Sequence, residues 1–567
     1  MTDTTLAGRV TRLRQQRTAP LILELDLTDG LAQARPADPL SAALGRHRPV
    51  LADVLDGLCR ARSDRRVEVL VARLGGQPIG LAAVQELRAA VTAFRAAGKH
   101  AVAWAESFGE FSAGTVPYYL ATAFDTICLQ PSGDLGLTGL AVERVFLRDA
   151  LDRLGAHVEV DKRHEYKSAA EQVTERGFSG PAREATERLI TSASEQIAAA
   201  IAERRGMPAG QARELIDRGP FLAEQALASG LVDVLAYRDE VYAQVRRRAG
   251  QGAVLQYLTR YQRTRALAER ARTAAAPRRP GIALVYATGP IRRGRSSRGP
   301  MSQAMGSDTI AAAIRAAAAD ELARAIVLRV NSPGGSYVAS DTIWREVVRA
   351  RAAGTPVVVS MGDVAASGGY FIAMAADAIV AEPGTITGSI GVLTGKPVLG
   401  EMLARAGITS DGVARGEHAG MFSALHPFTA DEQQLVARWL DHIYADFTGK
   451  VAAGRGLPAD RVHELARGRV WTGADARERG LVDELGGLDE AAALARRRAG
   501  LGPAAPVHAY PRIRPVERLL PAASSESPAA SAAGLFAESW GPAGQLAARA
   551  GWPGRGPLML PGSWRIA

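Results

Sequence analysis

The sequence predicts an α/β protein made of two similar halves, and two observations support this prediction. Short apolar runs typical of buried strands alternate with helical periodicity, and Gly- or Pro-containing connections separate them. The segments 118–125 and 219–233 recur as 370–377 and 469–483, both about 250 residues further along the chain. We therefore expect a duplicated domain with a largely parallel sheet in each copy.

Each predicted element follows from its local pattern. Continuous apolar runs or alternation indicate strands, and apolar residues repeating every three or four positions indicate helices. In the first half we expect strands at 21–27, 67–72, 101–104 and 158–160, and helices at 81–94 and 181–204. In the second half we expect strands at 325–330 and 356–360, and helices at 338–351 and 369–376.

Composition shifts suggest the domain boundaries. Arginine and proline accumulate between about 259 and 280, and Pro, Ala, Ser and Gly dominate after 503. We expect a first repeat over 1–255, a linker over 256–280, a second repeat over 281–502 and a tail over 503–567.

The composition excludes several classes of protein. The 567 residues are 47% hydrophobic and 23% charged, which is unlike a fibrous or wholly disordered chain. The two cysteines, Cys59 and Cys128, are too few for a disulfide framework or a zinc site. The sequence has no apolar run near the roughly 18 residues of a membrane span and no signal-peptide pattern at its start. We expect a cytoplasmic protein without metal or cofactor, and leave peripheral contact with the inner face of the membrane open.

The net charge of +10 makes anionic partners conceivable. However, 64 of the 69 basic residues are arginines, and they are spread along the chain among acidic residues. This distribution favours a compositional bias, so we expect no nucleic-acid partner. Lysine occurs at only five positions. At these positions the chemistry of lysine can be required, because arginine does not lose its proton in proteins and cannot act as a base.

Ser367 is the candidate nucleophile. It lies in the loop 361–370 between a predicted strand and a predicted helix, flanked by small residues. The backbone N–H of Gly368, with that of Gly334 or Gly335, would be able to hold a developing oxyanion there. The alternative is that these small residues only allow the helix to pack tightly.

A serine nucleophile needs a base. The chain has no Gly-x-Ser-x-Gly motif and no motif pairing one of its nine histidines with Ser367, so a histidine triad is open but unsupported. A lysine base must be neutral, which requires burial that lowers its pKa from about 10.4 to near 7–8. Lys167, in the segment 164–168, is one candidate; the alternative is a solvated lysine between a strand and a helix.

Four segments carry a resemblance to a known family. In chain order, 166–169, 326–336, 361–370 and 387–391 resemble the signature segments of the long, duplicated form of the signal peptide peptidase family SppA, also called protease IV. The resemblance implies two tandem crotonase- and ClpP-like domains of repeated ββα units. It also implies a serine endopeptidase that cleaves hydrophobic peptides such as remnant signal peptides, and a homotetramer.

The resemblance also implies the roles of the site residues. These are Ser367 as nucleophile, Lys167 as general base and Ser389 as a lysine-orienting residue, with Gly368, Gly334 and Gly335 at the oxyanion.

The repeat predicts that this site is divided between the halves. The position matching Ser367 in the first half is Thr115, which two glycines do not follow. The position matching Lys167 in the second half lies near Ala419, in a stretch without lysine. We therefore expect one site per chain, formed across the interface of the halves, and we do not favour Thr115 as a nucleophile.

Two other functions remain as rivals: a crotonase-like enzyme that handles acyl-CoA, and a non-catalytic scaffold of the same fold. Many relatives of the resembled family have an N-terminal membrane anchor, which this sequence does not show. Peripheral contact with an anionic membrane would then depend on the basic charge or on the segment 551–567, which contains Trp552 and Trp564.

Overall fold

A computed structural model of the chain describes residues 19–33, 48–250, 252–273, 278–298, 303–511 and 558–559. The described residues form two compact units. The first contains the residues before 142 together with 193–277, and the second contains 142–192 together with the described residues from 278 to 559. We describe each unit by itself.

The first unit is built on a six-stranded parallel sheet. The strand order across the sheet is β8-β4-β3-β2-β1-β9. The strands are β1 (Leu21–Asp26), β2 (Val67–Arg73), β3 (His100–Ala105), β4 (Thr126–Leu129), β8 (Val234–Leu235) and β9 (Val254–Tyr257).

Side chains that alternate along these strands pack on opposite faces of the sheet. Leu23 and Leu70 belong to the apolar cluster that contains the buried faces of helices α3 (Leu51–Ser63) and α4 (Leu81–Ala96). Val69 and Val71 belong to the opposite cluster, with helix α11 (Arg238–Ala249). A parallel sheet covered on both faces accounts for the continuously apolar strands in the sequence.

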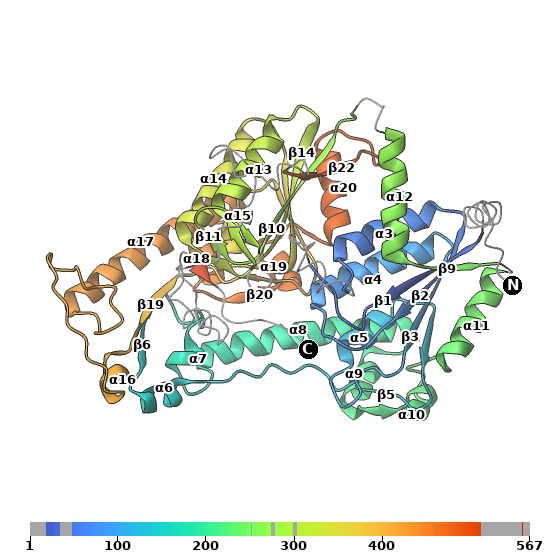
Figure 1. The fold of residues 1–567 in the computed structure, drawn as a ribbon, viewed down its shortest axis with the longest axis horizontal. Helices are drawn as coiled ribbons and strands as arrows, with labels where there is room; N and C mark the ends of the chain where they lie inside the picture. Colours follow the sequence, from blue (N-terminus) through green and yellow to red (C-terminus); the bar gives the residue numbers. More distant parts are fainter. Residues whose placement is uncertain are drawn as a thin grey trace. The chain divides into compact units, whose positions relative to one another are not determined.

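The second unit repeats this plan. Its sheet contains the order β21-β17-β16-β14-β10-β22, and the added strands β18 and β20 continue from β16. The strands are β10 (Gly281–Thr288), β14 (Ala323–Ser332), β16 (Val357–Ala366), β17 (Ala378–Ala381), β18 (Ile386–Gly388), β20 (Val470–Thr472), β21 (Glu484–Leu485) and β22 (Val507–Tyr510). Helices α13 (Ser307–Ala319) and α14 (Tyr337–Ala352) cover one face, and α20 (Leu488–Arg498) covers the other (Figure 1).

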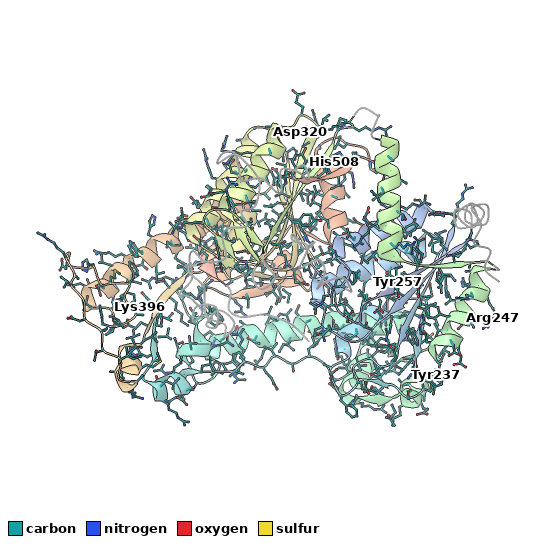
Figure 2. The ribbon with its side chains drawn as sticks, viewed as in Figure 1. Tyr237, Arg247, Tyr257, Asp320, Lys396 and His508 are labelled. Atoms are coloured by element: carbon teal, nitrogen blue, oxygen red, sulfur yellow. The ribbon has the colours of Figure 1, made fainter. Side chains whose placement is uncertain are left out.

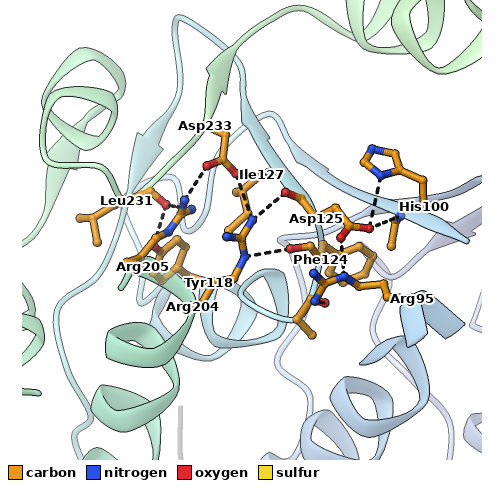
Figure 3. Close-up of polar contacts among 12 residues, drawn as sticks. Arg95, His100, Tyr118, Phe124, Asp125, Ile127, Arg204, Arg205, Leu231 and Asp233 are labelled. Atoms are coloured by element: carbon orange, nitrogen blue, oxygen red, sulfur yellow. Dashed lines mark hydrogen bonds and ion pairs between the residues drawn. The ribbon is translucent and has the colours of Figure 1, made fainter. Parts of the chain in front are cut away.

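Equivalent hydrogen bonds in the two units confirm the duplication. In the first unit the Tyr118 hydroxyl donates to the Leu231 carbonyl at 2.6 Å, and the backbone N–H of Ile127 donates to Asp233 at 2.8 Å (Figure 3). In the second unit the Tyr370 hydroxyl donates to the Leu481 carbonyl at 2.9 Å. The long helices α8 (Gly180–Arg205) and α17 (Ala430–Arg455) are also related by the repeat.

The segment 142–192 leaves the repeat to which it belongs in sequence. Its strand β6 (His157–Lys162) pairs antiparallel with β19 (Leu393–Val398), with Lys162 opposite Leu393. This ladder accounts for its place in the second unit. The sequence predicted a site with Lys167 from the first repeat and Ser367 from the second. Both residues lie within the second compact unit, because β6 of the first repeat pairs with a strand of the second.

Regular secondary structure extends beyond two of the expected boundaries. Helix α12 (Leu258–Thr273) occupies most of the stretch expected to be a linker, because Leu258 and Tyr261 are buried on it. Strand β22 pairs with β10 where the tail was expected to begin, and its Tyr510 hydroxyl donates to Asp320, which is labelled in Figure 2.

Cys59 is exposed and Cys128 is buried, and both are free thiols. No helix within the described ranges is long and apolar enough to cross a membrane. Residues 1–18, and the tail residues Trp552 and Trp564 considered for membrane contact, lie outside the described residues.

Candidate active site

Ser367 joins the end of β16 to helix α15 (Gly368–Ala373) and has φ 56°. A positive φ costs a serine roughly 1–3 kcal/mol, so the surrounding structure must hold it in place. Its N–H donates to the Gly388 carbonyl at 2.8 Å, and its own carbonyl accepts the N–H of Phe371 at 2.9 Å. These two bonds fix the direction of the Ser367 side chain.

The β6–β19 ladder carries Lys167 toward this serine. Just after β6, the N–H of Arg163 donates to the Val392 carbonyl at 2.9 Å, so the chain continues beside the segment 389–392. The N–H of Gly468 donates to the Ile390 carbonyl at 2.8 Å and closes the other side of that segment. Four residues beyond Arg163, Lys167 enters the interior with 1% of its surface exposed.

The Lys167 amine lies between two serines. Its Nζ atom is 2.9 Å from Ser367 Oγ, 3.0 Å from Ser389 Oγ and 3.0 Å from the Ser389 carbonyl oxygen. Burial lowers the pKa of Lys167 from 10.5 to about 7. Within the described part of the chain no acidic side chain forms an ion pair with it, so desolvation is not offset by an opposite charge. A neutral amine is therefore accessible near neutral pH.

Ser389 is held as firmly as Ser367. It has φ 51°, and its N–H donates to the Arg469 carbonyl at 2.7 Å. Gly388, directly before it, lies opposite Ala366 in the β16–β18 ladder. Ser389 is therefore positioned one residue past the strand that flanks the nucleophile, where both of its oxygens reach Lys167.

Two glycines that the sequence reasoning did not single out make room for the lysine. A Cβ on Gly468 would lie 2.5 Å from the Lys167 backbone nitrogen and 2.6 Å from its Cα. A Cβ on Gly391 would lie 3.4 Å from Lys167 Cδ. Gly468 also has φ 84°, which favours glycine. Gly391 ends a quoted motif, but Gly468 lies about 300 residues from Lys167, and no sequence pattern joins them.

The glycines expected at the oxyanion lie together. A Cβ on Gly334 would lie 2.6 Å from the Gly368 backbone nitrogen, and a Cβ on Gly368 would lie 3.1 Å from the Gly335 backbone nitrogen. The backbones can approach this closely only because none of the three residues has a side chain. The backbone amides of Gly368, directly after the nucleophile, and of Gly335, on the neighbouring strand, therefore lie close together, whereas the Gly334 N–H donates to Ser332 Oγ at 3.2 Å.

Charged residues support the lysine segment from outside. Arg467 forms an ion pair with Glu165, and Arg469 donates a hydrogen bond to the Tyr166 hydroxyl at 3.3 Å. Tyr166 also donates to Glu184 at 2.9 Å. The sequence motif 166–169 includes Tyr166, but no sequence pattern predicts its contact with Arg469 on the second repeat.

Other candidates lie elsewhere. Lys396, labelled in Figure 2, is buried on β19, but its amine donates to the Met421 carbonyl at 2.8 Å and lies over the Phe428 ring. Thr115 is the first residue of helix α5 (Thr115–Ala121) in the first unit. In the described ranges, no histidine hydrogen-bonds to Ser367 or Lys167, and no group of three His, Cys, Asp or Glu side chains could hold a metal ion.

Ser367 lies in a strained turn of a duplicated α/β fold and is hydrogen-bonded to a buried lysine with a pKa near 7. These are the features of a serine-type hydrolase. The chain belongs to peptidase family S49, whose model matches residues 93–252 and 349–502. A Clp protease model also matches residues 298–383. Family membership makes the chain a serine endopeptidase and supports neither an acyl-CoA enzyme nor a scaffold.

Two relatives agree with this assignment. The chain is 33% identical over 513 residues to Protease 4 of Salmonella typhi, covering 86% of this chain and 79% of that protein. It is 30% identical over 452 residues to the chloroplastic serine protease SPPA of Arabidopsis thaliana, covering 80% of this chain and 66% of that protein. Among solved structures, a ClpP1 variant from Listeria monocytogenes matches with a TM-score of 0.24 and 15% identity, covering 37% of this chain and 93% of that one.

Proposed function

We propose that the chain hydrolyses extended hydrophobic peptides with Ser367 as nucleophile and Lys167 as general base. The hydrogen bond of 2.9 Å between Lys167 Nζ and Ser367 Oγ, in a site that lowers the pKa of the lysine to about 7, is the observation that supports it most strongly. Ser389 is the proposed orienting residue, because it bonds Lys167 through two oxygens.

Acylation begins with Lys167 neutral. Its two N–H groups donate to the carbonyl and hydroxyl oxygens of Ser389, which leaves the nitrogen lone pair facing the Ser367 hydroxyl. As Ser367 Oγ attacks the scissile carbonyl, its proton moves to Nζ and the carbonyl oxygen becomes an oxyanion. The N–H of Gly368 and that of Gly334 or Gly335 stabilise this charge.

Collapse of the tetrahedral intermediate breaks the C–N bond. The Lys167 ammonium gives its proton to the leaving amine, so the lysine is neutral again and Ser367 carries an ester. Water then attacks the ester while Lys167 takes a proton from it, and the acid product leaves as the proton returns to Ser367 Oγ.

Hydrophobic peptides, including remnant signal peptides, are the proposed substrates. The family assignment and the apolar cluster that contains Ile291, Ile390 and Tyr370 near the site support this choice. An apolar environment beside the reacting atoms favours apolar over charged peptides, because burying an unpaired charge is costly.

Hydrolysis of a quenched-fluorescent, leucine-rich peptide tests the roles of both residues. Ser367→Ala and Lys167→Ala are each expected to lower kcat/KM at least about 10³-fold. Lys167→Arg is expected to be nearly as inactive, because a guanidinium stays protonated. Lys162→Ala is the matched control, since Lys162 lies on β6 and contacts Glu171 instead of Ser367; it is expected to retain activity.

Two outcomes would contradict this proposal. Full hydrolysis by Ser367→Ala would exclude that serine as nucleophile. Turnover by Lys167→Arg comparable to that of the unmodified chain would exclude the lysine as base.

We further propose a homotetramer. A pair of exposed aromatic rings supports an interface in the second unit: Phe422 and Trp439 are 65% and 54% exposed, and their rings stack 6.2 Å apart. Sedimentation velocity tests it: Trp439→Glu is expected to dissociate the assembly, whereas Leu267→Glu, at an exposed leucine of the first unit, is not. A monomeric unmodified chain would exclude the tetramer.

We also propose a cytoplasmic location with peripheral contact at an anionic membrane surface, supported by the net charge of +10. Co-sedimentation with phosphatidylglycerol vesicles, compared with neutral phosphatidylcholine vesicles, tests this contact. Equal recovery with both vesicle types would contradict it.

A further inference from the structure

The loop around Gly468 contacts the lysine segment at more residues than the lysine itself. Arg467 forms an ion pair with Glu165, two residues before Lys167, while Gly468 lies against the Lys167 backbone. Arg467 has φ 55°, a strained backbone for a residue with a side chain, and such strain persists only where the surrounding contacts hold it. The loop and the lysine segment are therefore held in one register.

The ring of Tyr166, directly before Lys167, lies near two guanidinium groups. The guanidinium carbon of Arg467 is 5.2 Å from the ring centroid, and that of Arg469 is 4.9 Å from it. At these distances a cation is attracted to the face of an aromatic ring. The Tyr166 hydroxyl also donates to Glu184 at 2.9 Å and accepts a hydrogen bond from Arg469 at 3.3 Å. These contacts fix the side chain that precedes the lysine.

The apolar contacts of Tyr166 lead toward the nucleophile. The ring packs against a cluster of buried side chains from α8, β16, β18 and β20, namely Ala185, Leu189, Ala366, Ile386 and Val470. Ala366 directly precedes Ser367. The side chain before the lysine and the residue before the nucleophile therefore belong to one packed group. A displacement of the Tyr166 ring disturbs the packing on both sides of the Ser–Lys hydrogen bond.

We propose that Tyr166 is a positioning residue for catalysis, whose ring fixes the backbone from which Lys167 reaches Ser367. The two arginines hold the ring in place. This inference rests on the proposed function, because it gives Tyr166 the task of placing the proposed base. The Lys167 amine is 2.9 Å from Ser367 Oγ, and a displacement near 1 Å costs about 10²-fold in rate. A displaced amine also meets water, which favours its charged form.

Steady-state hydrolysis of the leucine-rich peptide between pH 5 and 9 tests this role. Tyr166→Leu keeps an apolar side chain without the ring, and is expected to lower kcat about 10²-fold and to change KM less than about twofold. The midpoint of its kcat–pH curve is expected to rise by about one pH unit, because water reaches the amine.

Tyr166→Phe separates the ring from the hydroxyl. The hydroxyl donates to a Glu184 side chain that is 55% exposed, where a polar contact contributes little. This variant is therefore expected to retain kcat within about threefold of the unmodified chain. A loss of kcat equal to that of Tyr166→Leu would overturn the role of the ring.

Tyr242→Leu is the matched control. The Arg238 guanidinium lies 4.2 Å from the centroid of the Tyr242 ring, and the Tyr242 hydroxyl donates to Glu24 at 2.7 Å, so its contacts resemble those of Tyr166. Tyr242 belongs to the first unit, and the change is expected to leave kcat and the pH midpoint unaltered. An equal loss of kcat in both leucine variants would overturn the proposal.

The paired substitutions Arg467→Gln and Arg469→Gln test the hold on the ring with Tyr166 intact. They are expected to lower kcat about tenfold, a part of the effect of losing the ring, and to raise the pH midpoint. An unchanged kcat would overturn the proposal, even if Tyr166→Leu did not fold.

Two comparisons complete the test. A lower kcat in Tyr166→Leu with an unmoved pH midpoint would show a structural role only and would overturn the positioning role. If Lys167→Ala is inactive while Tyr166→Leu matches the unmodified chain, the positioning role fails and the proposed base stands. If Lys167→Ala cleaves at the full rate, the proposed function fails, and the positioning role fails with it.

Discussion

At the scale of single residues, the chemistry of the site depends on how Lys167 is desolvated. Its pKa is lowered by burial, and its hydrogen-bond partners are the uncharged oxygens of Ser367 and Ser389. A carboxylate in contact with the amine would favour the charged form and keep the lysine protonated. Burial without a contacting carboxylate therefore supports the proposed role of Lys167 as the base.

The pH dependence of kcat follows from this pKa. With a pKa of about 7, roughly half of the lysines are neutral at pH 7 and about a tenth at pH 6. We expect kcat for a hydrophobic peptide to rise with pH through about 7 and to level off above pH 8. Steady-state kinetics between pH 5 and 9 measure this; a kcat still rising tenfold per unit at pH 9 would mean that the lysine keeps its ordinary pKa.

The sequence predicted some site residues and missed others for a physical reason. Ser367 and Lys167 stand in short motifs next to recognisable strands, so their local structure was readable. Gly468 matters to the site because it packs against the Lys167 backbone, and this contact depends on tertiary structure alone. A glycine with positive φ in a loop has the same local pattern whether or not anything lies against it.

At the scale of elements, the loop containing Gly468 and the segment containing Lys167 must fit against each other. Gly468→Ala would place a methyl group 2.5 Å from the Lys167 backbone nitrogen. We expect the lysine segment to shift and kcat to fall about 10²-fold, because displacements near 1 Å cost about that much in rate. Peptide hydrolysis and the thermal midpoint Tm measure the effect.

Gly354→Ala is the matched control for this substitution. Gly354 has φ 83°, against 84° for Gly468, and a Cβ there would have no neighbour within 4 Å. Both variants should therefore lose about 1–2 kcal/mol of stability from the left-handed backbone, whereas only Gly468→Ala should lose activity. Similar activities in the two variants would show that the packing of Gly468 on Lys167 does not matter to catalysis.

The predicted elements were mostly correct, because the hydrophobic periodicity of an element and the Gly or Pro residues that end it are local features of the sequence. The predicted strand 325–330 lies within β14, and the predicted helix 338–351 lies within α14. The pairing of β6 with β19 was not predicted, since an antiparallel partner more than 200 residues away leaves no mark on either segment. The stretch expected to be a linker contains α12, on which Leu258 and Tyr261 belong to the apolar cluster of the first unit.

At the scale of the whole molecule, the duplicated fold is present in both units, whereas the hydrogen bond between Lys167 and Ser367 lies in the second unit. Both units keep the same order of strands in the sheet. Both also keep a tyrosine whose hydroxyl donates to a backbone carbonyl: Tyr118 to Leu231 in the first unit, and Tyr370 to Leu481 in the second. At the position matching Ser367, Thr115 begins a helix without the positive φ of the serine. The first unit has therefore kept the packing of the repeat but lacks the positive-φ turn that holds Ser367 in the second unit.

Thr115→Val tests whether the first frame retains any catalytic role. The hydroxyl of Thr115 is buried and has no hydrogen-bond partner among the described residues. Valine has the same shape, so we expect unchanged kcat/KM and a free energy of unfolding equal or up to about 1 kcal/mol higher, since an unpaired buried hydroxyl is lost. A fall in peptide hydrolysis with Tm unchanged would indicate that Thr115 takes part in the reaction.

The most direct test of the central claim is to label the active serine with a fluorophosphonate and locate the adduct by mass spectrometry. We expect one adduct per chain, on Ser367, forming at a rate that rises with pH through about 7 and falls at least about 10³-fold in Lys167→Ala. An adduct on another residue, or labelling of Ser367 at an undiminished rate without Lys167, would contradict the account.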